Sequence, residues 1–571
     1  MADWRRVTTG ALAGWLLAAV PAFAQPAPAA TVQPATAKPD TALRADGPPP
    51  WEELGARIGA CFEREDPVCA APLVADLERL VPDAAATAWC RGMVELLSGR
   101  YESARAALQR AAGSTAAPAG LRERAQSYLD LVESTMEVHA GSQARKLAGG
   151  RVVVYLHPGP DEVLLPYLER VLSQALPRLE ATFGRLDESP IRLHVYARVQ
   201  DLGKVSGLTV EQIRNSGTIA LCKYNRVMIT SPADLVFGYP WADTVVHELV
   251  HHYMTRRGGP QVPLWLHEGL ARAFQGVWRD QDPGQLDLEE RKTLAAARAK
   301  NRFIPLAKMS PSLALLPTQD DTALAFAQVH HAVAWLLAKA ASRQGEFANA
   351  QAFSAQAARL VGLFADGATE DRALQQLIGL TPGAFVTAWR RDLAKVNLDE
   401  SEQAELPVKR QPLLFRGAGP GPGPGGLKDL SDQAKQYAEL GDRLAVLKRP
   451  LAAAIEYRKA IAAHPDQGPL LVGRLARVLL DMGKHAEALE YVTPALSSWP
   501  DHAPLYILAG RAHVAGGRPK QALDALDAAA WLNPYDPELH ALAAQAYTAL
   551  GQTADAAAAR AREGLVGSLA P

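Results

Sequence analysis

The sequence predicts an α+β domain between two helical segments, and three observations support this fold class. Short β-branched runs such as Val152–Leu156 occur between about residues 150 and 230. From Tyr239 to about Val396 the apolar residues follow helical spacing instead, and strands followed by helices are typical of α+β domains. Residues 51–140 and the region after about residue 430 are also helical in pattern, without strand signals.

The composition of the 571-residue chain is close to the average of soluble globular proteins, with 48% hydrophobic and 21% charged residues. The 60 Lys and Arg residues nearly balance the 61 Asp and Glu residues, for a net charge of −1. Nucleic-acid binders normally carry a basic excess, and so do proteins held on membranes by basic clusters. We therefore expect no nucleic-acid partner and no polybasic attachment to a membrane.

Residues 1–24 have the pattern of a secretory signal peptide. Arg5 and Arg6 precede the apolar stretch Ala11–Val20, which is too short to span a bilayer, and Ala22–Ala24 has the small-x-small pattern of a cleavage site. The alternative is an anchor that stays uncleaved. We expect a secreted, most simply periplasmic protein, with no stable membrane insertion after the signal is cleaved.

The cysteines are too few for a disulfide scaffold, but one bridge is expected outside the cytoplasm. Cys61, Cys69 and Cys90 lie close together in the sequence, and Cys222 is remote. The sequence alone does not define which two of the first three are joined.

Changes in composition divide the chain into six segments. Two of them are linkers whose composition cannot bury a core. The segments are the signal peptide (1–24), an Ala/Pro-rich linker (25–50), a helical domain (51–148), the α+β domain (149–400), a Gly/Pro-rich linker (401–428) and a repeat array (429–566).

Four strands and a helix are expected in the first half of the α+β domain. The helix runs from about Asp161 to Phe183 and follows the first strand. The strands are Val152–Leu156, Ile191–Tyr196, Thr218–Cys222 and Arg226–Thr230.

An HExxH motif, His247–His251, lies on the predicted helix that begins near Pro240 and ends at a Gly/Pro-rich break. The spacing of four residues places both imidazoles on one face of the helix, where they can bind one metal ion. Glu248 points to the adjacent face. A tetrahedral metal site needs one more protein ligand than these two histidines provide.

A second predicted helix begins near Pro263 and contains the phrase Trp-Leu-His-Glu-Gly-Leu-Ala at residues 265–271. This phrase resembles the third-ligand helix of gluzincin metallopeptidases, which are the thermolysin-like and aminopeptidase-N-like enzymes. The resemblance covers about residues 150–395 and is closest to bacterial peptidase-MA-like domains. It implies a thermolysin-like zincin fold, with a small mixed sheet and a helical subdomain. It also implies a Zn²⁺ ion held by His247, His251 and Glu268, with Glu248 as the general base.

His267 is a rival to Glu268, and Asp243 is a candidate for a supporting role. Neighbouring helical residues point about 100° apart, so only one of His267 and Glu268 can face the metal. The resemblance favours Glu268, and we expect His267 to matter little for metal binding. Asp243 lies one turn before His247, where it can either orient a metal-binding histidine or cap the helix.

The sequence departs from this family where related enzymes place a tyrosine that stabilises the oxyanion. Phe326 stands at that position and has no hydroxyl group. His330 or His331 can take over the role, or both can be ordinary helix residues.

A second departure concerns the acidic Gly-x-Met-Glu-Asn segment with which related aminopeptidases hold the amino terminus of the substrate. No such segment occurs here, and Asp234 is the only acidic residue between Asn215 and Trp241. The resemblance therefore implies an endopeptidase that cleaves peptide or protein substrates.

The C-terminal array has a period of 34 residues. Gly483, Gly517 and Gly551 recur at this spacing, and each is followed five positions later by an alanine. This pattern resembles tetratricopeptide repeats, which implies an all-α solenoid that binds a protein partner. Residues 99–104 repeat the same phrase, so the N-terminal helical domain can hold further repeats. We expect the array to be a separate unit that does not contribute to the metal site and has no fixed interface with the α+β domain.

Two functions follow from these patterns. The first is a secreted zinc endopeptidase with repeats for partner binding, and the ligand set and base favour it. The second is a catalytically weak or inactive scaffold acting through its repeats, which the phenylalanine at position 326 favours.

Overall fold

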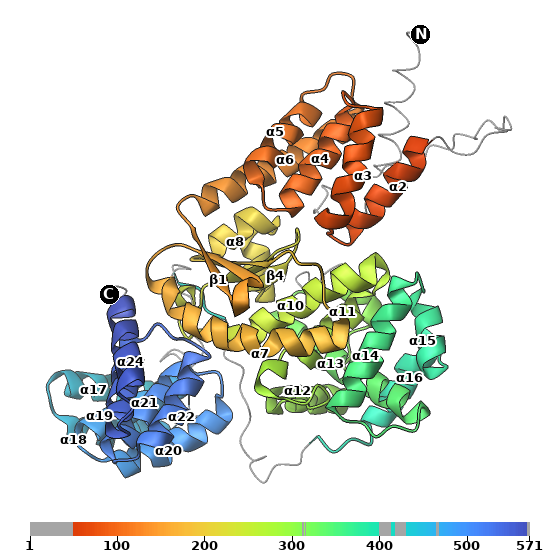
Figure 1. Ribbon diagram of the computed structural model, residues 1–571. Helices are drawn as coiled ribbons and strands as arrows, with labels where there is room; N and C mark the ends of the chain where they lie inside the picture. The colour runs from red at the N-terminus through yellow and green to blue at the C-terminus, as the bar shows by residue number, and fades with distance from the viewer. Residues whose placement is uncertain are drawn as a thin grey trace.

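The computed structural model describes residues 50–310, 313, 316–398, 413–416, 430–463 and 468–567. The expected signal peptide, nearly all of the Ala/Pro-rich linker and the Gly/Pro-rich stretch 417–426 lie outside them. Figure 1 shows three parts, which are an N-terminal domain of helices, a central domain around one sheet, and the helical repeat array. The expected fold class is confirmed. No helix within these residues is long and apolar enough to cross a membrane.

The N-terminal domain packs five helices around a core of its own, with Trp89 fully buried at its centre. These helices are α2 (Pro50–Glu63), α3 (Pro67–Leu80), α4 (Ala85–Leu97), α5 (Tyr101–Ala112) and α6 (Ala119–His139). Cys61 and Cys69 form a disulfide across the turn between α2 and α3, while Cys90 is free and buried. The structure thus selects one of the pairings that the sequence left open.

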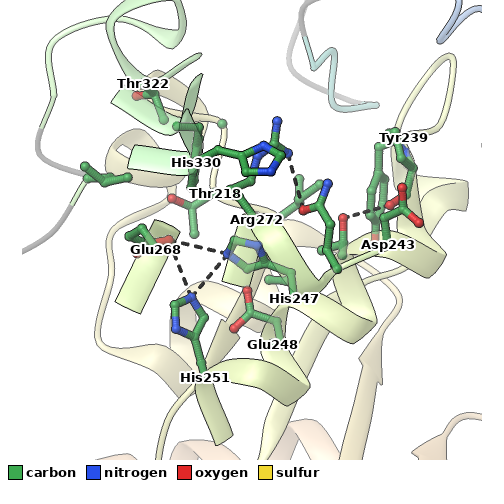
Figure 2. Close-up of a pocket in the computed structure, with 18 of the residues that line it drawn as sticks. Thr218, Tyr239, Asp243, His247, Glu248, His251, Glu268, Arg272, Thr322 and His330 are labelled. Carbon is green, nitrogen blue, oxygen red and sulfur yellow. Dashed lines mark hydrogen bonds and ion pairs between the residues drawn. The ribbon is translucent and has the colours of Figure 1, made fainter. Parts of the chain in front are cut away.

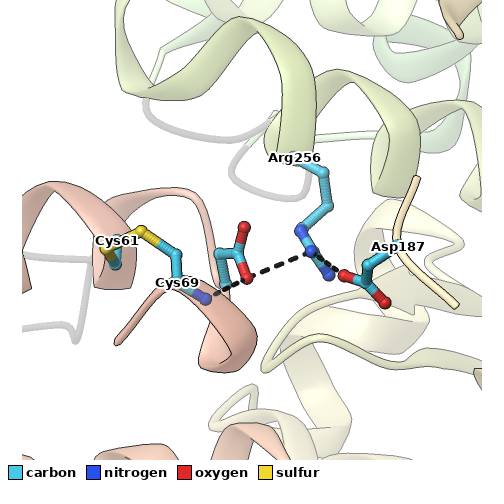
Figure 3. The surroundings of a disulfide bond; sticks show 5 residues. Cys61, Cys69, Asp187 and Arg256 are labelled. Carbon is cyan, nitrogen blue, oxygen red and sulfur yellow. Dashed lines mark hydrogen bonds and ion pairs between the residues drawn. A yellow bond between two sulfur atoms is a disulfide. The ribbon is translucent and has the colours of Figure 1, made fainter. Parts of the chain in front are cut away.

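The turn closed by this disulfide is also tied to the central domain (Figure 3). Asp66 caps α3 by accepting a hydrogen bond from the backbone amide of Cys69 at 2.9 Å. The same carboxylate lies 3.1 Å from the guanidinium of Arg256, which also pairs with Asp187. The N-terminal domain is therefore fixed to the helix that carries Arg256.

The central sheet has five strands in the order β1-β2-β3-β5-β4. The inner strands are parallel, and each edge strand is antiparallel to its neighbour. The strands are β1 (Gln143–Leu147), β2 (Val152–Leu156), β3 (Ile191–Tyr196), β4 (Ala220–Cys222) and β5 (Val227–Thr230).

The sequence did not predict β1. Its residues are Gln-Ala-Arg-Lys-Leu and mostly exposed, so they lack the apolar alternation that marks a half-buried strand. Because β1 pairs with β2, the sheet begins before the expected domain boundary at residue 149.

Two long helices pack in one core with the sheet. The helix α7 (Leu165–Phe183) connects β2 to β3, and α10 (Trp241–Gly258) contacts α7, β4 and β5. The short helix α8 (Val199–Ser206) lies on the other side of the sheet from α7 in Figure 1.

The second half of the central domain is helical, as expected. Its helices are α11 (Leu264–Phe274), α12 (Leu288–Ala299), α13 (Gln319–Arg343), α14 (Ala350–Ala365), α15 (Glu370–Ile378) and α16 (Pro382–Leu393). Of these, α11 packs very closely on α13, because a Cβ atom at Gly269 would lie 2.6 Å from the carbonyl oxygen of Val329.

The repeat array consists of helical hairpins. Its helices are α17 (Asp432–Val446), α18 (Pro450–Ala463), α19 (Pro469–Asp481), α20 (His485–Ser498), α21 (Ala503–Ala515), α22 (Pro519–Ala530), α23 (Pro537–Ala549) and α24 (Thr553–Val566). The repeating glycines Gly483, Gly517 and Gly551 have φ of 73°, 68° and 75°, in the left-handed region that glycine enters without strain. The 34-residue period thus marks the turn inside each hairpin.

The array is docked on the central domain, so the expectation of no fixed interface between them is wrong. Tyr535 and Val566 belong to the same core cluster as the central sheet. The hydroxyl of Tyr535 lies 2.5 Å from Asp161 Oδ1 and 2.9 Å from Ser231 Oγ, and all three residues are buried. Burial raises the pKa of Asp161 although both hydroxyls lower it.

Backbone atoms of the array also hold the start of α10. The indole of Trp241 donates to the carbonyl of Ala530 at 3.0 Å, and the amide of Tyr239 donates to the carbonyl of Leu532 at 3.0 Å. Gly238, with φ of 75°, approaches so closely that a Cβ atom there would lie 2.1 Å from the oxygen of Leu532. No side chain fits at this point of the interface.

Part of the expected linker is anchored as well. Phe415 forms a β-bridge with Leu235, and the amide of Val236 donates to the carbonyl of Leu414 at 2.9 Å. The chain between the central domain and the array is thus tied down near α10.

Gly238→Ala should undock the array from the central domain, because the new methyl group meets a backbone oxygen that cannot move away as a flexible side chain would. Gly367→Ala is the control, since Gly367 has φ of 83° but open space around it, so it carries only the backbone strain of about 1–2 kcal/mol. Small-angle scattering and proteolysis of the linker should separate the two variants. Equal compactness in both would contradict a fixed interface.

Candidate metal site and cleft

The helix α10 carries three of the expected site residues in one buried stretch. Trp241 begins the helix and is fully buried, and the apolar residues between it and Tyr253 pack into the core. His247 and His251, one turn apart, turn their rings to the same place, with the two Nε2 atoms 3.2 Å apart. The sequence-predicted convergence of the two imidazoles is present.

Glu268 on α11 completes a cluster of three (Figure 2). Its Oε2 atom lies 3.4 Å from Nε2 of His247 and 3.5 Å from Nε2 of His251. One ligand atom of each residue lies within 4.8 Å of the others, so the group could hold a metal ion.

The pKa shifts in the cluster follow from burial and from the charge of Glu268. Burial lowers the pKa of His247 to about 4, although Glu268 acts in the opposite direction. Burial would also lower the pKa of His251, but Glu268 outweighs it and the net shift is upward. Burial alone would raise the pKa of Glu268, yet the two histidines hold it well below its usual range. The carboxylate is therefore charged in the site.

Glu248 stands beside the cluster without joining it. It is buried, and its Oε2 atom has no hydrogen-bond partner among the described residues. Burial and, less strongly, the charge of Glu268 raise its pKa to about 7, against the lowering effects of His251 and of a backbone hydrogen bond from Cys222. A carboxylate with one unpartnered oxygen in this position can accept a proton from a group that enters the site.

His267 is placed differently from what the sequence suggested. Its Nδ1 atom lies 3.2 Å from Nδ1 of His251, on the side of that ring opposite to the cluster. An imidazole that binds a metal through Nε2 carries its proton on Nδ1, and a partner for that proton fixes its tautomer and orientation. His267 is thus an orienting partner of His251, a role that depends on how α10 and α11 cross.

Asp243 takes neither of the two roles expected for it. Its carboxylate accepts a hydrogen bond from the indole of Trp278 at 2.8 Å and pairs with Arg279 at 2.6 Å. It therefore neither orients a histidine of the cluster nor caps α10, and instead ties this helix to the segment that follows α11.

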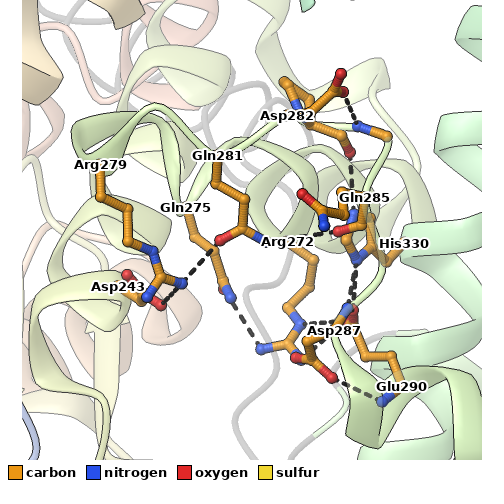
Figure 4. Close-up of polar contacts among 12 residues, drawn as sticks. Asp243, Arg272, Gln275, Arg279, Gln281, Asp282, Gln285, Asp287, Glu290 and His330 are labelled. Carbon is orange, nitrogen blue, oxygen red and sulfur yellow. Dashed lines mark hydrogen bonds and ion pairs between the residues drawn. The ribbon is translucent and has the colours of Figure 1, made fainter. Parts of the chain in front are cut away.

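His330 lies in a buried network next to the cluster (Figure 4). Its Nδ1 atom is 2.9 Å from Glu290 Oε2 and its Nε2 atom is 3.0 Å from the carbonyl oxygen of Pro283. Glu290 also pairs with Arg272 at 2.9 Å. His330 would have to give up one of these contacts to reach a substrate.

His331 points elsewhere, since its Nδ1 atom accepts a hydrogen bond from the indole of Trp389 at 2.8 Å. Phe326 packs edge-on against His247, with ring centroids 5.9 Å apart. The guanidinium of Arg272 lies 5.3 Å above the Phe326 ring. Arg272 follows Glu268 by one helical turn, and sequence reasoning missed it although that spacing places both on one face.

Two family models match the chain. Residues 171–395, which contain the whole cluster, match the model described as Peptidase MA superfamily. This region is a peptidase MA superfamily domain. Residues 479–530 match a tetratricopeptide repeat model, so the array is built of these repeats. No curated protein matches the chain.

Two of the solved structures with some likeness to the chain have low overall structural similarity to it. A thermophilic TPR protein of Thermus thermophilus is 28% identical over 23% of this chain and 74% of its own, with a TM-score of 0.22. The APC/C hetero-tetramer Cut9–Hcn1 is 14% identical over 90% of this chain and 93% of its own, also with a TM-score of 0.22.

A cleft of about 1110 Å³ opens beside the three-residue cluster of the peptidase domain. Residues from every part of the chain line it. Glu63 and Glu65 come from the N-terminal domain, Leu413 from the linker, and Tyr506 and Trp531 from the repeats. The repeats thus line the cleft, while the metal cluster itself holds no repeat residue among the described residues, as expected.

Replacing Glu268 by Gln should lower the affinity for Zn²⁺ more than replacing His267 by Ala, because only Glu268 points its ligand atom at both histidines. His267→Ala removes the orienting partner of His251, and this loss should still weaken zinc binding by roughly 10–100-fold. His331→Gln is the control. Competition with a chromophoric chelator measures all three affinities, and a larger loss with His267→Ala would make His267 the ligand.

Proposed function

We propose that the protein is a zinc-dependent peptidase that cleaves peptide bonds within a chain. The observation that carries this proposal is the convergence of Nε2 of His247, Nε2 of His251 and Oε2 of Glu268, with the unpartnered Oε2 atom of Glu248 beside them. The peptidase MA match supports the same reaction class.

The donor set suits Zn²⁺. Two imidazoles and one carboxylate are common ligands of catalytic zinc, which keeps a fourth position open. Ligand atoms about 2.1 Å from a tetrahedral ion lie about 3.4 Å from each other, and the three distances here are 3.2, 3.4 and 3.5 Å. The side chains are thus arranged for such an ion without further movement.

The reaction needs a proton acceptor next to the attacking water. When bound, Zn²⁺ polarises the substrate carbonyl and acidifies water. Glu248 takes the proton of the attacking water and passes it to the departing amine. His267 holds the ring of His251 in place during both steps.

The substrate lies along β4 in this proposal. This strand is at the edge of the sheet, and residues 216–223 line the cleft. Its outward backbone groups, apart from the amide of Cys222 that bonds Glu248, can pair with an extended peptide. Glu65 of the N-terminal domain holds the turn after β4 by accepting the amides of Tyr224 and Asn225 at 2.7 and 2.6 Å. The edge strand is therefore fixed before a substrate arrives.

Cleavage within a chain is proposed because this strand offers no clamp for a free amine. The only acidic residue between Asn215 and Trp241 is Asp234, and its carboxylate already accepts the amide of Val199 at 2.8 Å.

An inactive scaffold is the second candidate. It is favoured by Phe326, which has no hydroxyl for an oxyanion, and by the contacts that already occupy both ring nitrogens of His330. The role of His330 or His331 in stabilising the oxyanion stays a prediction.

We also propose that the protein acts outside the cytoplasm, most simply in the periplasm, with residues 1–24 as its export signal. The Cys61–Cys69 disulfide supports this location, because such bonds persist in oxidising compartments.

Glu248→Gln should reduce peptide hydrolysis by at least about 100-fold while zinc stays bound, since the amide keeps the size of the carboxylate but accepts no proton. Glu63→Gln is the matched control, because Glu63 lines the same cleft on the N-terminal domain. Cleavage of an unfolded protein and zinc content are measured together. A zinc-loaded wild-type chain without any cleavage would favour the scaffold.

Blocking the amino terminus of a peptide substrate should leave its cleavage rate within about twofold, because β4 binds the backbone rather than a free amine. Mass spectrometry of the products from acetylated and free peptides tests this. Stepwise loss of single residues from free amino termini alone would overturn the assignment as an endopeptidase.

A further inference from the structure

The tetratricopeptide repeats contribute residues to the cleft beside the metal cluster. They form part of its wall, and the segment after α22 that docks at the start of α10 also lines it. The end of α20 contributes Leu496, and the loop that follows it contributes Pro500 and Asp501. Ala528 lies at the end of α22, and Trp531 directly follows that helix. The docked position therefore sets the shape of the space next to the metal cluster.

This wall is fixed relative to the HExxH helix. The ring of Trp531 lies 4.6 Å from that of Trp278 and 5.7 Å from that of Trp241, centroid to centroid. The carbonyl of Ala530, next to Trp531, accepts the indole hydrogen of Trp241. A substrate in the cleft thus meets a surface that cannot swing away without breaking buried contacts of α10.

The chemistry of the wall is mainly apolar. Leu496, Pro500, Tyr506 and Ala528 are each half-buried and line the cleft, so they are covered on one side and open on the other. Half-buried apolar side chains in a preformed hollow favour an apolar ligand group, which removes both surfaces from water.

The size of the cleft fits a chain longer than the residues around one peptide bond. Its volume of about 1110 Å³ is above the range of about 300–1,000 Å³ for small-molecule pockets. Its lining includes residues 216–223 at the edge strand, the three-residue cluster and residues of the repeats. One extended peptide can reach all three.

We propose that the tetratricopeptide repeats supply a substrate subsite, formed by Leu496, Pro500, Tyr506 and Ala528, that takes an apolar side chain of the extended peptide whose backbone lies along β4. This inference rests on the proposed peptidase function for its biological meaning. It assigns to the repeats the selection of substrate sequence, in addition to holding the start of α10.

The test measures peptide binding in a zinc-loaded Glu248→Gln chain, so that the result does not depend on hydrolysis. The probe is an unstructured, fluorescently labelled peptide of roughly 20 residues, long enough at about 3.3 Å per residue to span the cleft. A second peptide has serine in place of every Leu and Phe. Ala528→Trp fills the subsite, and Ala515→Trp puts the same bulk on an exposed position of α21 that does not line the cleft.

The apolar peptide should bind about tenfold more tightly than the serine peptide, the effect of burying one apolar side chain. Ala528→Trp should remove this difference, whereas Ala515→Trp should preserve it. Circular dichroism and zinc content confirm that both variants are folded and loaded. Equal binding of the two peptides, or an unchanged preference in folded Ala528→Trp, would overturn the subsite. If the preference behaves as expected but wild-type protein hydrolyses nothing, the peptidase proposal fails and the subsite stands as the binding site of a scaffold.

Discussion

The close packing of α11 on α13 at Gly269 is the contact on which the metal cluster depends. A Cβ atom at this position would lie 2.4 Å from a methyl group of Val333 and 2.6 Å from the backbone oxygen of Val329. Only glycine lets the two helices come this close. The neighbouring Glu268 is thereby carried to within 3.5 Å of both histidines of α10. A shift of α11 by the width of a methyl group would remove the third ligand, because such sites tolerate displacements of only about 0.5 Å.

The same packing places several ionisable groups close together in a region with little solvent exposure. Glu248 and His247 are buried, His251 and Glu268 are half-buried beside them, and a buried carboxylate is unfavourable unless it is paired. The histidines compensate Glu268, whereas one oxygen of Glu248 has no partner among the described residues. A bound cation would satisfy the ligand atoms together, so metal binding and the stability of the α10–α11 pair are linked.

The parts of the site that lie on one helix were predictable from the sequence, and the parts that depend on helix crossing were not. His247, Glu248 and His251 are ordered by helical periodicity alone, and Glu268 was reached through its resemblance to a family phrase. The contact of His267 with His251 arises only where α10 and α11 meet. Asp243 was misread because its partners Trp278 and Arg279 follow α11, more than thirty residues later in the chain.

The strand β1 and the docking of the repeats escaped prediction for related reasons. An edge strand with polar, exposed side chains carries no apolar alternation. The repeats dock partly through carbonyl oxygens of Ala530 and Leu532, which every residue type possesses, so no side-chain pattern records the interface.

This use of backbone oxygens has a consequence for how the protein can diversify. The interface between the repeats and α10 is formed partly by main-chain atoms, whereas the wall of the cleft is formed by side chains such as those of Leu496 and Tyr506. Side chains such as Leu496 and Tyr506 can be substituted without changing the main-chain contacts of this interface. Natural variation, or deliberate exchange of these side chains, can thus change what the cleft accepts while α10 keeps its backbone support.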